Sequence, residues 1–152
     1  MKEQYLETIR LIERLHREFL EVVKGEIDRL GIRDINNVQA LILYNIGEDE
    51  LTVGELTNRG YYLGSNVSYN VRKMVDNDYL IQQRSTHDRR AIRVRLSEKG
   101  LALWKRIDQI FDGHAEKLVE RQFSDEDMES AAATLKRLER FMLAPFGFGP
   151  AA

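Results

Sequence analysis

A short run of polar side chains recurs at helical spacing between residues 65 and 75. Asn66, Tyr69 and Lys73 follow one another at intervals of four residues or fewer, so they fall on one face of a helix, with Asn70 beside them. Valines and a methionine form an apolar stripe on the other face. Amides, a phenol and an ammonium are groups that pair with base edges and phosphates. The pattern indicates a helix face suited to a nucleic-acid duplex, with the candidate contacts Ser65, Asn66, Ser68, Tyr69, Asn70 and Lys73.

A second polar cluster lies further along the chain, between two short strands. Residues 92–96 alternate Ile, Val and Leu with two arginines, which predicts a half-buried strand, and residues 80–84 form its expected partner. The tip between them holds His87, Arg89 and Arg90. An arginine at such a tip can enter the minor groove of DNA, where the negative potential is focused. We therefore add Arg89 and Arg90 to the candidate contacts.

The two clusters need a scaffold, and the preceding residues supply one. Thr52 and Glu55 stand three residues apart as a capping box at the start of a helix. Gly60 and Gly64 bound a turn, and the polar-faced helix follows it. Helix, glycine-containing turn and helix form a helix-turn-helix, whose second helix enters the major groove. With the hairpin as a wing, we expect a mainly α fold with a small β wing.

Each feature also has an ordinary structural explanation. The polar face could be the exterior of a solvated helix, and a charged hairpin resists pairing with another sheet edge. A winged helix that serves as a protein-interaction module, without base contacts, is the competing functional class. The two features side by side favour DNA, and salt-dependent retention on heparin or duplex DNA separates the two classes.

Charge is segregated along the chain. The 152 residues carry a net charge of −2, yet residues 59–99 hold nine Lys or Arg against four Asp or Glu. This basic part coincides with the helix-turn-helix and the wing, as a local electrostatic footprint would. The absence of cysteine excludes disulfides and thiol chemistry, and no apolar run is long enough to span a membrane. With no signal-peptide pattern at the N-terminus, we expect a single cytoplasmic domain over residues 1–152.

Amphipathic helices flank the DNA-binding region, which we place at residues 36–100. Apolar residues recur at spacings of three and four over residues 3–30 and again over residues 101–143. These stripes exceed what one winged helix could cover, so we expect the two flanking regions to hold a homodimer. Residues 144–152, with two prolines, form a C-terminal tail.

Smaller signals mark where the helices and one short strand begin. Asn36 and Gln39 form a capping pair, and Ser97 and Ser124 are good N-caps for the last two helices. Leu51 is expected in a strand of one or two residues that joins the wing.

Residues 80–100 resemble the winged-helix signature of the MarR family of bacterial transcriptional regulators. The family pattern is an aspartate, any residue, an arginine and then Leu-Thr/Ser, matched here by Asp88, Arg90, Leu96 and Ser97. The resemblance covers nearly the whole chain. It implies a homodimer on a pseudo-palindromic operator, a repressor relieved by a small aromatic ligand. The run of residues 64–71 is similar to the sub-branch that includes regulators of L,D-transpeptidase genes.

The resemblance also implies roles for single residues. By analogy with the family, Asp88 pairs with a basic group and shapes the wing, which leaves Arg90 to reach DNA. The family binds small aromatic anions where the dimer helices meet the winged helix. His16, Tyr44 and Trp104 place polar tips on apolar bodies and are ligand candidates, although core packing is the better explanation for all three. We expect a ligand to act by changing the spacing of the two half-sites, roughly 34 Å, rather than by blocking the DNA face.

The sequence predicts neither an enzyme nor a cofactor. His16, His87 and His114 lie on three different elements and lack metal-ligand spacing, so no metal site is expected. No phosphate-binding glycine loop is present. The expected partners are double-stranded DNA, a second copy of the chain and a small aromatic effector.

Overall fold

The computed structural model describes residues 1–60, 64–84 and 92–144, and the chain divides into two compact units, Met1–Ile110 and Phe111–Ala152. The first unit contains, in order, α1 (Lys2–Arg29), α2 (Asn37–Ile46), β1 (Leu51–Thr52), α3 (Val53–Gly60), α4 (Gly64–Asp76), β2 (Leu80–Arg84), β3 (Ile92–Leu96) and the start of α5 (Glu98–Glu120). The second unit holds the end of α5 and α6 (Asp125–Leu143). The expected mainly α fold with a small β wing is confirmed.

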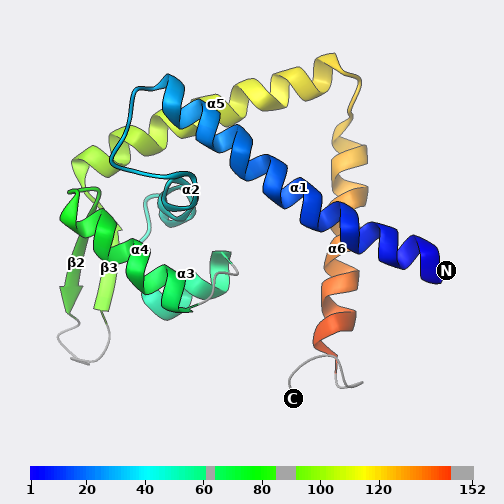
Figure 1. Cartoon of the computed structure of the whole chain (residues 1–152), viewed down its shortest axis with the longest axis horizontal. Helices are drawn as coiled ribbons and strands as arrows, with labels where there is room; N and C mark the ends of the chain where they lie inside the picture. The colour runs from blue at the N-terminus through cyan, green and yellow to red at the C-terminus, as the bar shows by residue number, and fades with distance from the viewer. Residues whose placement is uncertain (61–63, 85–91, 145–152) are drawn as a thin grey trace. The chain divides into compact units, whose positions relative to one another are not determined.

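The core of the first unit forms around α2. Figure 1 shows α2 almost end-on, between α1 and the pair α3 and α4. Every side of α2 meets another element, so its sequence is apolar nearly all round rather than striped. Its fully buried side chains meet others from α3, α4 and β3; together they are Ile42, Leu43, Ile46, Leu56, Val67, Met74 and Val94.

The wing is a three-stranded antiparallel sheet with the order β1-β3-β2. Leu80 pairs with Leu96, and Val94 lies between Leu51 and Gln82. The predicted alternation of β3 is confirmed, since Val94 and Leu96 are buried while the two arginines between and before them are exposed. The short strand expected at Leu51 is also present, so the start of α3 is anchored to the wing.

Side-chain caps begin the helices at the predicted residues. Asn36 and Gln39 form a reciprocal capping box on α2, and Ser124 forms one with Asp127 on α6. Hydrogen bonds from the backbone N–H and the hydroxyl of Ser124 hold the pKa of Asp127 below its ordinary value. The Ser97 hydroxyl accepts the N–H of Gly100 at 3.0 Å in the first turn of α5. These caps satisfy amides that a helix leaves without an internal partner.

The end of α4 is tied to the loop after α1 and to the start of α5. Tyr79 is buried, and its hydroxyl donates to Asp34 Oδ1 at 2.6 Å. Lys99 of α5 reaches Asp34 Oδ2 at 3.1 Å and the Asn77 carbonyl oxygen at 2.9 Å, with its ammonium 4.2 Å from the centre of the Tyr79 ring. We call Asp34, Asn77, Tyr79 and Lys99 the Asp34 cluster.

The protonation states in the Asp34 cluster follow from these contacts. The Tyr79 hydrogen bond, with help from Lys99, outweighs the effect of burial and lowers the pKa of Asp34. Burial, then the Asp34 carboxylate, raises the pKa of Tyr79. Because the pKa of Asp34 is lower in the folded protein, its contribution to stability is present above the ordinary carboxyl pKa. That contribution is lost as the pH falls through the lowered value.

Helix α5 approaches the backbone at Tyr79 so closely that residue 100 must be glycine. A Cβ atom at Gly100 would stand 2.2 Å from the Tyr79 carbonyl oxygen and 3.3 Å from the Leu96 Cβ atom. The same carbonyl oxygen accepts the Ser97 N–H at 3.0 Å. The contact is backbone against backbone, so no side chain can move aside to relieve it.

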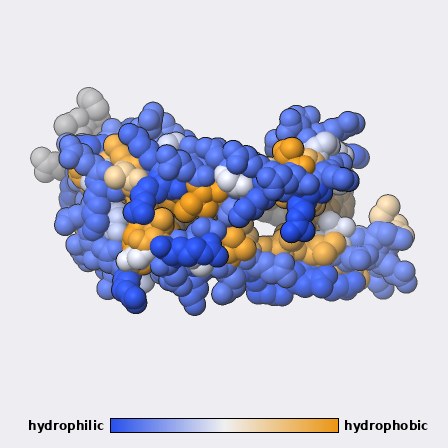
Figure 2. Space-filling model, turned by 90° about the horizontal axis from the view of Figure 1, so that it is seen from above, coloured by the Kyte–Doolittle hydropathy of each residue, from blue (hydrophilic) through white to orange (hydrophobic). Residues whose placement is uncertain are grey.

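Large apolar side chains reach the surface of the single chain along the long helices. Figure 2 shows such groups between hydrophilic side chains. No side chain of α6 is buried. Nothing among the described helices is long and apolar enough to cross a membrane. The exposed apolar residues include Leu11, Ile12, Leu15, Phe19 and Val22 in α1, and Met128, Leu135, Phe141 and Leu143 in α6.

Replacing Gly100 by alanine is expected to lower the free energy of unfolding by about 1–3 kcal/mol, because the added methyl overpacks a rigid contact. Gly113 lies in the same helix, and a Cβ atom added there would meet no other atom within 4 Å. Gly113→Ala is therefore the matched control and should gain about 0.5–1 kcal/mol from helix propensity. Urea unfolding followed by circular dichroism measures both; equal effects of the two substitutions would contradict the close approach.

Candidate nucleic-acid interface

The exposed face of α4 carries four of the eight residues predicted to contact DNA. Asn66, Ser68, Tyr69 and Lys73 are all exposed. The Lys73 ammonium lies 5.8 Å from the centre of the Tyr69 ring, one helical turn away. The side chain of Ser65 lies outside the part of the structure that is described. The predicted face is thus present for these four residues.

Asn70 departs from the prediction that it lies on this open face. It is only 8% exposed, and its Oδ1 accepts a hydrogen bond from Gln39 Nε2 of α2 at 3.1 Å. Its Nδ2 donates to the Asn66 carbonyl oxygen at 2.8 Å. Both ends of the amide are used inside the protein, so Asn70 fastens α4 to α2 instead of offering an amide to a base edge.

The same contact joins the cap of α2 to α4. Gln39 Oε1 accepts the Asn36 N–H at 3.1 Å while Gln39 Nε2 donates to Asn70. One glutamine therefore satisfies a helix terminus and a second helix at once. The described residues contain no buried side-chain nitrogen or oxygen without a partner. The buried polar groups between α2 and α4 all have hydrogen-bond partners, and a buried polar network stabilises a core only under that condition.

Arg72 is a candidate contact that the sequence analysis missed. It is exposed and follows Tyr69 by three residues, on the other flank of the same open face. Arg72 falls just outside the helical series of polar residues that begins at Asn66, which is why the sequence pattern did not single it out. The one acidic residue of α4, Asp76, is exposed at the last position of the helix.

The wing strands carry further cations. Arg84, Arg93 and Arg95 are exposed on β2 and β3. Arg59 of α3 pairs with Asp49 at 2.6 Å and donates to the Asn45 carbonyl oxygen at 3.2 Å, so it fastens α3 to the turn after α2. The predicted wing-tip residues lie outside the described residues, and their roles stay predictions: His87, Asp88, Arg89 and Arg90.

A cavity of about 390 Å³ is bounded by residues of α1, of α2 with its N-cap, and of the N-terminal half of α4. His16, a predicted ligand residue, lines it together with three predicted DNA contacts, Asn66, Tyr69 and Asn70. Asn36 adds a third amide to those of Asn66 and Asn70, and the apolar part of the lining consists of Leu20, Val38, Leu41, Ile42 and Val67. We call this space the α4 cavity.

Tyr44 and Trp104, the other two ligand candidates, do not line the α4 cavity. Their rings stack with centroids 5.6 Å apart and an angle of 12° between the planes. Trp104 Nε1 donates to the Tyr44 carbonyl oxygen at 3.0 Å, and the Tyr44 hydroxyl donates to Asp108 at 2.7 Å. Their polar tips are engaged in holding α2 to α5, so the packing explanation describes what they do in this structure.

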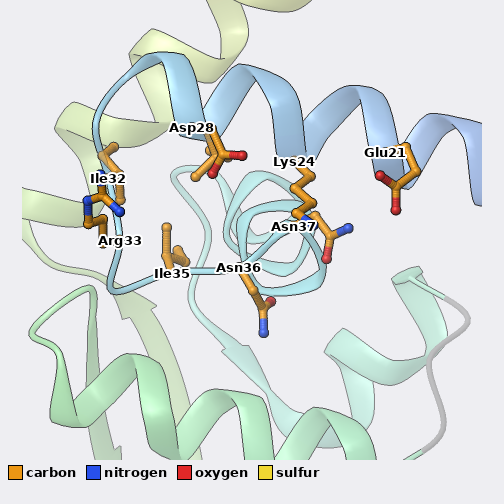
Figure 3. A pocket seen from close by; sticks show the side chains of 9 residues that line it. Glu21, Lys24, Asp28, Ile32, Arg33, Ile35, Asn36 and Asn37 are labelled. Atoms are coloured by element: carbon orange, nitrogen blue, oxygen red, sulfur yellow. The ribbon is translucent and has the colours of Figure 1, made fainter.

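A second cavity, of about 430 Å³, lies between the C-terminal half of α1 and the loop that leads to α2 (Figure 3). Its lining mixes charges of both signs, Glu21 and Asp28 with Lys24 and Arg33, and all four side chains are exposed. It has no aromatic lining and does not include a residue of α4. A group of three or more side chains able to hold a metal ion is absent from the described residues.

Comparison with known proteins decides the family. The sequence profile described as MarR family matches residues 33–91. The exopolysaccharide II synthesis transcriptional activator ExpG of Rhizobium meliloti (strain 1021) is 42% identical over 135 residues, which cover 89% of this chain and 70% of ExpG. The chain belongs to the MarR family. It is a transcriptional regulator of the MarR type.

Solved structures of MarR-family members agree with the fold. The S. aureus MepR–DNA complex has a TM-score of 0.70 and 23% identity, covering 85% of this chain and 93% of MepR. Streptococcus pneumoniae FabT in complex with DNA has a TM-score of 0.65 and 22% identity, covering 89% and 96%. At these identities the likeness shows the winged-helix fold, while the contacts to DNA must be argued from this chain's own residues.

Replacing Asn70 by alanine is expected to cost about 1–3 kcal/mol of stability, because Gln39 Nε2 is left buried without its acceptor. In a double-mutant cycle, Gln39→Ala and Asn70→Ala should couple by at least about 0.5 kcal/mol. Asn66→Ala, on the exposed side of the same helix, should change stability by no more than about 0.5 kcal/mol. Additive effects of the Gln39 and Asn70 substitutions would show that the hydrogen bond contributes nothing.

Proposed function

We propose that the protein is a homodimeric DNA-binding regulator that reads one half-site of a pseudo-palindromic operator with the exposed face of each α4. The observation that carries the proposal is the composition of that face: Asn66, Ser68, Tyr69, Arg72 and Lys73 are exposed together. Two cations contact phosphates, while the amide and hydroxyl groups reach base edges. The wing then lies beside the adjacent minor groove. We propose a cytoplasmic location for such a regulator.

The dimer is proposed from the apolar surface of α1 and α6. Exposed leucines, an isoleucine and a phenylalanine lie along α1 in the first unit, and α6 in the second unit has no buried side chain, so each helix offers apolar surface to a partner. A twofold-symmetric partner covers the same patch on both chains. Sedimentation at micromolar concentration tests this, with an expected mass twice the 17.7 kDa of one chain.

DNA binding is tested by selecting duplexes from a random pool with the full-length protein and then measuring affinity as a function of salt. A winged helix that binds DNA through several phosphates loses affinity steeply with salt, with a log–log slope of about −0.9 per phosphate neutralised. Recovery of a two-part sequence with a twofold axis supports the proposal. A protein-interaction module would instead enrich no sequence and show only weak, nonspecific retention.

Repression is the direction of regulation implied by the family resemblance, whereas ExpG is by name an activator. Occupancy of the operator is the activity common to both. A reporter gene driven by a promoter that carries the selected operator reads the direction: lower expression with the protein present supports a repressor, and higher expression an activator.

We assign the α4 cavity as the site of a small aromatic effector. Its apolar lining fits an aromatic body, and His16 together with the amide of Asn66 supplies polar partners at its margin. The cavity shown in Figure 3 fits such a ligand less well, because its lining is charged and lies apart from α4.

Arg90→Ala is expected to weaken operator binding by about 1–3 kcal/mol if Arg90 makes a groove contact. Stability should stay within about 0.5 kcal/mol of the unmodified protein, since the sequence predicts a hairpin-tip arginine that contributes little to folding. Arg95→Gln, in the exposed middle of β3, is the matched control for removal of a wing charge. Fluorescence anisotropy at fixed salt measures the operator affinity of both variants. Equal losses of affinity would show that Arg90 contributes only its charge and makes no specific groove contact.

An effector bound in the α4 cavity should lower the affinity of the protein for operator DNA. Operator DNA should then lower the affinity for the effector by the same factor. Small aromatic acids found by thermal shift are titrated with and without operator. Val38→Phe, which fills the cavity from α2, should abolish the effect, while Ile32→Phe in the cavity of Figure 3 should not. Compounds whose affinity is the same with and without DNA would rule out effector control through this site.

A further inference from the structure

The side chain of Tyr69 is exposed, although its ring is large and mostly apolar. Its exposed fraction is 59%, although burying such a ring is among the larger favourable terms available to a protein. Among the described side chains of α4, residues 66–76, every other large apolar group is buried or half-buried. Tyr69 is therefore the one large apolar group that α4 presents outward.

The helix geometry places this ring at the centre of the open face. At 100° per residue, the buried side chains Val67, Val71 and Met74 define the direction of the core, and Tyr69 points away from it. Asn66 and Lys73 flank it on one side and Arg72 on the other. When α4 enters a major groove with this face forward, the ring leads, with polar groups around it.

The ring is also held in place. The Lys73 ammonium lies 5.8 Å from its centroid, so the cation stands over one side of the ring and leaves the rest free. Tyrosine has only two side-chain torsions, so ordering it costs little entropy compared with a long side chain. An ordered apolar ring is suited to a fixed apolar target.

The major groove contains one kind of apolar group. The edges of guanine, cytosine and adenine present hydrogen-bond donors and acceptors, and only thymine adds a methyl group, at C5. A ring pressed against a polar base edge would strip water from that edge without replacing its hydrogen bonds. A ring pressed against the thymine methyl buries apolar surface on both partners.

We propose that Tyr69 is a specificity-determining residue that selects thymine in each half-site by packing its ring on the C5 methyl group. The proposal rests on the proposed function, since it assumes that α4 reads an operator. It assigns the hydroxyl of Tyr69 no part in the selection. Lys73 acts as a positioning residue for the ring and contacts the phosphate backbone with the rest of its ammonium.

The test removes one methyl group at a time. Operators are obtained by selection with the full-length protein, and each thymine is replaced by deoxyuridine, which lacks the C5 methyl and keeps every hydrogen-bonding group. Affinity should fall about fourfold for the thymine under Tyr69, and about fifteenfold when the symmetry-related thymine is replaced as well. Replacements elsewhere in the operator should have no comparable effect.

Variants of Tyr69 link the methyl group to the side chain. Tyr69→Ala should bind the thymine and deoxyuridine operators with equal affinity, whereas Tyr69→Phe should keep the full ratio. Arg72→Gln, which removes a neighbouring cation, should weaken both operators alike and leave their ratio unchanged. Circular dichroism and urea unfolding confirm that each variant is folded, and the exposed position of Tyr69 makes that the expected result.

Three results would overturn the inference. Equal binding of all deoxyuridine operators by the unmodified protein would show that no methyl is read. An unchanged ratio in Tyr69→Ala would assign the methyl contact to another side chain. An operator with no thymine in its conserved positions would leave Tyr69 no methyl group to select. Failure to select any operator is a different outcome, which removes the proposed function itself and this inference with it.

Discussion

The arrangement of the DNA-binding unit depends on the close packing of the first turn of α5 against the backbone at Tyr79. The Tyr79 carbonyl oxygen occupies the space that a Cβ atom of residue 100 would need, and it accepts the Ser97 N–H. Tyr79 lies between the end of α4 at Asp76 and the start of β2 at Leu80, so this contact fixes α5 against the segment that joins α4 to the wing. Because the contact joins backbone to backbone, the relative positions of these three elements have little freedom to vary.

The Asp34 cluster extends that constraint to α1. One carboxylate accepts the Tyr79 hydroxyl on one oxygen and the Lys99 ammonium on the other, while Asn77 donates to the Asp34 carbonyl oxygen at 3.0 Å. The loop after α1, the end of α4 and the start of α5 thus share one set of polar contacts. Asp34 and Lys99 are about half exposed, so solvent weakens the ion pair. The hydrogen bond from the buried Tyr79 hydroxyl to Asp34 is the contact that fixes the geometry of the cluster.

Local signals in the sequence predicted the elements well, because each depends on neighbours a few residues away. The capping box at Asn36 and Gln39, the cap at Ser124 and the alternation of β3 are all of this kind. Contacts between distant residues were not predictable in the same way. Gln39 meets Asn70 across 31 positions, and Tyr79 meets Asp34 across 45. A polar residue beside an apolar stripe can face solvent or a buried partner, and the spacing of Asn70 alone does not distinguish the two.

The position of Tyr69 changes how control by an effector can be understood. From the sequence, a ligand is expected to alter the spacing of the half-sites without touching a DNA contact. In the structure, Tyr69 lines the α4 cavity and is also exposed on the open face of α4. A ligand in that cavity would therefore directly touch α4, the helix that we propose reads a half-site. It shifts the balance between free and DNA-bound protein only as far as its affinities for the two states differ. A ring that cannot contact the ligand and the thymine methyl in the same orientation supplies such a difference at each half-site separately. If the effector acts through Tyr69, it should lower both the affinity for the operator and the preference for thymine over deoxyuridine. If it only changes the spacing of the half-sites, the affinity should fall while the preference for thymine stays the same.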